Sequence, residues 1–100
     1  MRNVPYPHPG EILQEEFLKP LDISAYQVWK ATGISQTAIG LIVAGERSIT
    51  PETALLLSRF FGMSDQFWIK LQLDYDSAKA RKKIGARLAK VQPYEHHAMV

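Results

Sequence analysis

Apolar residues recur at spacings of three and four along most of the chain, the period typical of amphipathic helices. The first such segment spans residues 10–18, with Pro9 near its start and Pro20 closing it. The fourth runs from about residue 50 to 61, and the fifth follows a cap at Ser64. No segment makes a convincing strand. The pattern therefore predicts an all-α fold of five helices with no significant sheet.

The second and third predicted helices lie within residues 24–49 and are separated by a short hinge. Ser24 and Ser35 are expected to cap them, and Gly33 lies between them, where a left-handed backbone costs little. So short a turn forces the helices to cross steeply, so that the second projects into a DNA major groove while the first braces it. The segment outlines a helix-turn-helix, with the expected inward positions Val28, Trp29, Ile39 and Ile42.

The fifth predicted helix is more apolar than a monomer requires. Its main stripe is formed by side chains at spacings of three and four, and Ile69 and Leu73 lie off that stripe. Part of this surface is expected to meet a second subunit, because two-fold recognition of a palindromic operator needs a dimer. The candidate dimer-interface residues are Phe67, Ile69 and Leu73.

Length and composition favour one small domain. A chain of 100 residues with 46% apolar side chains supports one core. We expect a single helix-turn-helix domain with a C-terminal helix over residues 1–92, and a frayed tail over 93–100. The chain has no cysteine, which excludes disulfides and thiolate metal sites. It also has no apolar run long enough for a membrane helix and no signal-peptide core, so we expect a cytoplasmic protein.

The distribution of charge is more informative than the net charge of +2. Half of the twelve basic residues fall between Lys79 and Lys90, and no acidic residue occurs between Ser77 and Tyr94. Such a stretch fits a phosphate backbone or an acidic partner, but the commoner interpretation is a solvated helix face. The N-terminal segment is acidic by contrast, with Glu11, Glu15, Glu16 and Asp22.

Three further motifs occur in order along residues 8 to 80: HPGEILQEEFLKPL, TPETALLLSRFFG and FWIKLQLDYD. Together they resemble the HigA antitoxins, a branch of the phage-repressor-like (XRE) helix-turn-helix family. The resemblance implies a homodimeric antitoxin of a HigBA-type toxin–antitoxin system. Such a protein binds and neutralises a small RelE-like, mRNA-cleaving toxin and represses their shared operon by binding its operator.

The resemblance also implies DNA contacts at the start and outer face of the third helix and in the loop after it. Glutamine can bond both hydrogen-bonding positions of adenine, so Gln36 is the best candidate for reading a base. The full set of candidate DNA-binding residues is Lys30, Ser35, Gln36, Thr37, Gly40, Leu41, Arg47 and Ser48.

Two positions depart from the family pattern. Leu41 is apolar where polar or basic residues are usual, and Glu46 carries a negative charge where lysine is usual. Leucine can contact only a thymine methyl group, and a carboxylate beside a phosphate is repelled. An alternative therefore stays open. In this alternative, the protein is a helix-turn-helix-fold interaction module, or a stand-alone regulator, and its specific DNA binding is weak or lost.

Catalysis finds little support in the sequence. The serines have no adjacent base, and Glu11, Glu15 and Glu16 are expected on a solvated face. His96 and His97 lie in the tail without suitable neighbouring ligands, and His8 is expected at a helix entry. We therefore expect no enzyme, cofactor, metal, membrane or small-molecule substrate.

Overall fold

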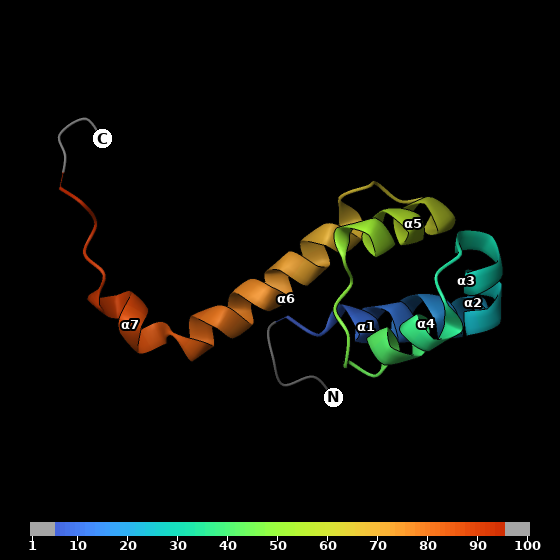
Figure 1. The fold of residues 1–100 in the computed structure, drawn as a ribbon, viewed down its shortest axis with the longest axis horizontal. Coiled ribbons are helices and arrows are strands. Elements are labelled where there is room, and N and C mark those ends of the chain that lie inside the picture. Colours follow the sequence, from blue (N-terminus) through green and yellow to red (C-terminus); the bar gives the residue numbers. More distant parts are fainter. Residues whose placement is uncertain (1–5, 96–100) are drawn as a thin grey trace.

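The structure, a computed structural model, describes residues 6–95 and is all-helical there, as predicted. A continuous N-terminal helix is followed by two short helices, a third of eleven residues, a long helix and a short final one (Figure 1). The bounds are α1 Pro9–Ile12, η1 Leu13–Leu18, α2 Lys19–Leu21, α3 Ala25–Thr32, α4 Gln36–Val43, α5 Pro51–Phe61, α6 Phe67–Lys83 and α7 Gly85–Lys90.

The N-terminal helix continues through Pro20 rather than closing there, so the predicted end is wrong. Its middle segment, η1, is a π-helix, and the Lys19 N–H donates to the Gln14 carbonyl five residues back. Proline has no N–H to donate, and the wider π turn changes the hydrogen-bond register just before it. The helix ends instead at Asp22, which adopts the left-handed conformation with φ 56°.

The helix-turn-helix is confirmed in its local detail. Ser24 and Gln27 form a reciprocal capping box at the start of α3, and the Ser35 hydroxyl accepts the Ala38 N–H at the start of α4. Gly33 ends α3 with φ 84°, the left-handed conformation that glycine adopts at little cost.

Trp29 was predicted to point inward, and the structure places it on the surface, 41% exposed. Val28 is fully buried, and the half-buried Ala25 and Thr32 share its face of α3. Successive residues in an α-helix are about 100° apart, so burying Val28 turns Trp29 away from the core. Its ring packs beside exposed Tyr26 instead, with 5.5 Å between ring centroids.

The core lies between the N-terminal helix, α3, α4, α5 and the first half of α6. Trp68 is fully buried at its centre, in contact with an aromatic cluster of Phe17, Phe61 and Phe67. The buried aliphatic residues around it are Ile12, Leu13, Leu18, Val28, Ile34, Ile39, Ile42, Ile49, Ala54 and Leu57.

The C-terminal part differs from the prediction in two ways. Ser64 does not cap α6 through its side chain; its carbonyl accepts the Phe67 N–H, and α6 begins three residues later. The second half of α6 extends away from the core and is followed directly by α7, an additional helix that continues beyond the end of α6 (Figure 1). The proposed boundaries, 1–92 and 93–100, stay predictions, and residues 96–100 lie outside the described range.

Candidate nucleic-acid interface

Helix α4 has one buried face and one exposed face. Ile39 and Ile42 are almost completely buried, and they fix the helix against the core. The exposed residues Gln36, Thr37 and Gly40 lie outside that buried face, and exposed Ser35 caps the N-terminus of the helix. No other residue would contact a Cβ added at Gly40, so this part of α4 is open to a partner. The structure thus brings four of the predicted DNA-binding residues together on one accessible surface.

The N-terminal helix holds α4 in place through a backbone contact. A Cβ added at Gly10 would collide with the carbonyl group of Ile42, so only glycine fits there. The preceding His8 caps this helix, because its Nδ1 accepts the Gly10 N–H at 2.9 Å. The HPGE motif therefore positions the last turn of α4.

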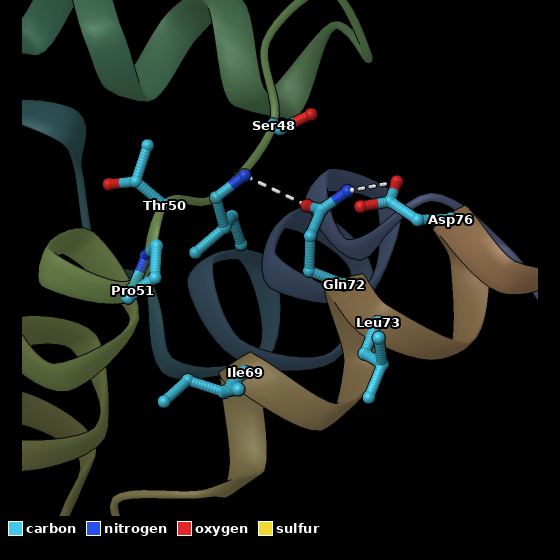
Figure 2. Close-up of a pocket in the computed structure, with 8 residues that line it drawn as sticks. Ser48, Thr50, Pro51, Ile69, Gln72, Leu73 and Asp76 are labelled. Atoms are coloured by element: carbon cyan, nitrogen blue, oxygen red, sulfur yellow. Dashed lines mark hydrogen bonds between the residues drawn. The ribbon is translucent and has the colours of Figure 1, made fainter.

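The loop between α4 and α5 is held by α6 (Figure 2). The buried Gln72 side chain accepts the Ile49 N–H through Oε1 at 2.8 Å and donates through Nε2 to Asp76 Oδ1 at 3.0 Å. Ile49 itself is buried, whereas Glu46, Arg47 and Ser48 before it are exposed. Gln72 thus anchors the loop and leaves its predicted phosphate-contacting residues accessible.

Four residues that support the interface were not identified as site residues from the sequence: His8, Gly10, Gln72 and Asp76. Gly10 meets Ile42 and Gln72 bonds Ile49, and both partners lie far away in the chain, so no local spacing signals these contacts. His8 and Asp76 bond to neighbours within four residues, and they support the interface only through Gly10 and Gln72. The only available signal was the presence of all four in the HPGE and FWIKLQLDYD motifs.

The electrostatics of the interface are weakly positive at best. Helix α4 carries no charged side chain, and Lys30 is exposed on α3. In the loop, Arg47 is offset by Glu46. A pocket of about 190 Å³ brings this loop together with Lys79 of α6 and is lined by His8, Gly45, Glu46, Arg47, Ser48, Tyr75, Asp76 and Lys79. Leu41 is half-buried, so its contact surface for a groove is reduced.

The candidate dimer-interface residues separate into two groups. Ile69 and Leu73 line an apolar pocket of about 320 Å³ between α6 and the α4–α5 loop (Figure 2). Leu73 is 60% exposed although it is apolar. Phe67 is half-buried and packs its ring against Phe17 and Trp68, so it belongs to the core cluster.

Residues 6–95 contain no candidate metal site, because no three His, Asp or Glu side chains of that range come close enough together to bind a metal ion. His96 and His97 lie outside the described residues. No helix of the described chain is both long and apolar enough to cross a membrane.

Comparison with known proteins assigns the fold to a family. The family profile described as Helix-turn-helix matches residues 15–68. Virulence-associated protein I of Dichelobacter nodosus is 46% identical over 79 residues, which cover 79% of this chain and 73% of that protein.

Two solved structures extend the likeness over nearly the whole chain. A HigA-family addiction module antidote protein from Coxiella burnetii is 43% identical, with a TM-score of 0.80 over 94% of this chain and all of that one. The Pseudomonas aeruginosa antitoxin HigA, in a structure with the higBA promoter, is 37% identical, with a TM-score of 0.82 over 89% of this chain and 98% of that one. The chain belongs to the HigA family.

Membership in the HigA family places the protein among helix-turn-helix antitoxins and transcriptional regulators, and the matched residues 15–68 include the helix-turn-helix of residues 24–43. Its relatives are regulators and antitoxins rather than enzymes. The HigA resemblance that three motifs indicated is thereby confirmed.

Proposed function

We propose that this HigA-family protein is a homodimeric antitoxin that represses its own operon by inserting α4 into the major groove of its operator. It also binds and neutralises a RelE-like, mRNA-cleaving toxin. The observation that carries the proposal is the accessible outer face of α4, held rigidly from behind by Ile42, Gly10 and the core. The P. aeruginosa relative solved with its promoter supports DNA as the partner of that face.

Base reading is proposed for the first turn of α4. Gln36 and Thr37 are exposed at the helix N-terminus, the end of a recognition helix that usually contacts base edges. A bidentate contact from Gln36 to adenine contributes about 1–3 kcal/mol of discrimination. Gly40 presents bare backbone one turn later, and half-buried Leu41 offers an apolar edge for a thymine methyl group.

Phosphate contacts are proposed on both sides of that turn. Ser35 and Lys30 lie before it, and Arg47 and Ser48 lie in the loop that Gln72 anchors. Such contacts fix the orientation of the protein on DNA and carry no sequence information.

Neutralisation of the toxin is proposed from family membership, and its mechanism is stoichiometric. The antitoxin holds the toxin away from its target and performs no chemistry. Co-expression with a toxin candidate from a neighbouring gene tests it: the candidate should arrest growth alone, and this chain should relieve the arrest. Persistent arrest, with both proteins made, would contradict this part of the proposal.

The second candidate function is a protein-interaction module with weak or lost DNA specificity. It is favoured by the absence of charge on α4 and by the Glu46 carboxylate. It is weakened by the half-burial of Leu41 and Val43, because these residues then expose only a small apolar area to a protein partner.

The two candidates are separated by two single substitutions tested on promoter DNA and on single-base variants of it. Arg47→Ala should weaken binding to about the same extent on every sequence, because it removes a phosphate contact. Gln36→Ala should relax preference at one base pair, by about 1–3 kcal/mol. Thr53→Ala on α5 is a control from outside the interface. Equal losses on all sequences for both variants would show that Gln36 reads no base.

A further inference from the structure

The second half of α6 carries a row of lysines that begins beside the DNA-facing loop. Lys79 lines the same pocket as Arg47 and Ser48. Lys82 and Lys83 follow at spacings of three and four, so all three lysines share one face of the helix. These three lysines, Lys79, Lys82 and Lys83, are called the basic edge below.

The basic edge has no internal partner that accounts for it. All three lysines are exposed, and within residues 6–95 the structure gives none of them an ion-pair partner. Lys79 instead lies over the Tyr75 ring, with its Nζ 5.8 Å from the ring centroid. By contrast, Lys19, Arg59 and Lys70 each face a carboxylate within 4 Å.

The charge along the basic edge is one-sided beyond its first lysine. Two carboxylates line the pocket that Lys79 enters: Asp76, which accepts a hydrogen bond from Gln72, and Glu46. From residue 77 to 94 the chain has no acidic side chain at all. A positive strip therefore starts at the loop and continues along a helix that extends away from the core (Figure 1).

Resting on the proposed function, we propose that the basic edge binds DNA phosphates next to those reached by Arg47 and Ser48, and so lengthens the backbone contact beyond the helix-turn-helix. The ligand is the sugar–phosphate backbone of duplex DNA. This contact supplies the sequence-independent affinity that uncharged α4 and Glu46 do not supply. Sequence reading remains with Gln36 and Thr37.

A purely structural role is the main competing explanation. Basic side chains in the last turn of a helix interact favourably with its dipole, and Lys82 and Lys83 lie in that turn of α6. When these lysines are replaced, a purely structural role predicts a change in stability and no change in the salt dependence of DNA binding. The salt dependence therefore distinguishes the two explanations.

The test compares the salt dependence of DNA binding among four proteins, each used as the full-chain dimer. They are the wild type; K79Q/K82Q/K83Q; the charge-keeping K79R/K82R/K83R; and the matched control K19Q/R59Q/K70Q, which removes the same three charges elsewhere. Each is titrated by fluorescence anisotropy against promoter DNA and scrambled DNA at several salt concentrations. Thermal unfolding of each confirms that it is folded.

Each lost phosphate contact lowers the magnitude of the slope of log K against log salt by about 0.9. Two to six contacts per dimer then lower the K79Q/K82Q/K83Q slope by roughly 2 to 5, on both DNAs. The promoter preference stays unchanged, and the arginine variant and the control keep the wild-type slope. A K79Q/K82Q/K83Q slope equal to that of the control would overturn the inference.

Failure of the proposed function gives a different result. In that case the wild type itself shows no preference for promoter over scrambled DNA. The slope comparison still reports on the basic edge, because phosphate contacts occur on any sequence.

Discussion

Gly10 shows how much one missing methyl group determines in this protein. A Cβ there would meet the carbonyl of Ile42, which is backbone and cannot rotate away. Gly40, by contrast, lies in a helix with nothing near the position of an added Cβ. Packing therefore requires glycine at position 10 and does not require it at position 40.

Gly10→Ala is expected to lower the free energy of unfolding by about 1–3 kcal/mol, since it overpacks a tight contact. Gly40→Ala is the matched control and should raise stability by roughly 0.5–1 kcal/mol, the usual gain of alanine over glycine inside a helix. Urea unfolding of both variants measures the difference. A Gly10→Ala protein as stable as the wild type would show that α1 does not pack on α4 in this way.

His8 links stability to pH. Partial burial lowers the pKa of its imidazole below the usual 6.5, and nearby Lys79 lowers it further, while Asp76 and Glu11 act in the opposite direction. The folded state thus binds a proton less readily than the unfolded state, and Nδ1 must stay unprotonated to accept the Gly10 N–H. Stability conferred by neutral His8 is present above the unfolded pKa and is lost as pH falls below it.

Thermal unfolding should therefore show a falling midpoint as pH drops from about 7 to about 5, the range in which histidine titrates. His8→Asn keeps a side-chain acceptor at the cap and should lose most of this dependence. The control replaces His96 and His97 with Asn, and it should keep the dependence. If His8→Asn still shows the full drop, other groups cause it.

At the scale of elements, the sequence predicted the features that depend on neighbouring residues better than those that depend on distant contacts. Caps at Ser24 and Ser35, and the helix end at Gly33, could be predicted because each depends on neighbours within four residues. The inward placement of Trp29 failed because an apolar side chain next to a buried position can lie on either side of the stripe. Helix α7 was missed because it is only six residues long and Leu88 is its one large apolar side chain, too little to show a helical period.

The sequence predicted which residues form the exposed surface of the site, but it did not predict the contacts that hold that surface in place. Exposure of Gln36, Thr37 and Arg47 follows from the periodicity of α4 and from the loop after it. The bond from Gln72 to Ile49 joins residues 23 positions apart, and no pattern in one sequence reveals such a pair. Which residues touch DNA stays a prediction.

That bond can be tested through the loop it holds. Gln72→Leu keeps an apolar body on α6 but leaves the buried Ile49 N–H without its acceptor, which should cost about 1–3 kcal/mol. Asp76→Asn is the control, because its side chain can still accept from Gln72 Nε2. Hydrogen exchange should show faster exchange at Ile49 in Gln72→Leu alone. Unchanged exchange there would exclude Gln72 as the anchor of the loop.

At the scale of the whole molecule, the structure has a core at one end and a long helix extending from it (Figure 1). Dimerisation through α6 is proposed because Leu73 is exposed beside Ile69 at an apolar pocket. Two copies of α4 on one two-fold axis would then address two half-sites of an operator.

Leu73→Glu is expected to convert the dimer to monomer and to weaken promoter binding at least tenfold, because a carboxylate in an apolar interface is costly to bury. Leu21→Glu is the control, since Leu21 is also exposed and lies at the end of α2, away from the pocket. Sedimentation analysis gives the masses. A dimeric Leu73→Glu protein would place the subunit interface elsewhere.

The most direct test of the central claim is fluorescence anisotropy of the purified protein on its own upstream promoter DNA and on scrambled DNA, at two salt concentrations. The repressor account predicts binding to the promoter that is tighter by about a thousandfold or more, the ordinary range of specific recognition. Weak binding that is equal on both DNAs and lost with added salt would leave only backbone contacts. That result would contradict operator recognition by α4 and favour the protein-interaction module.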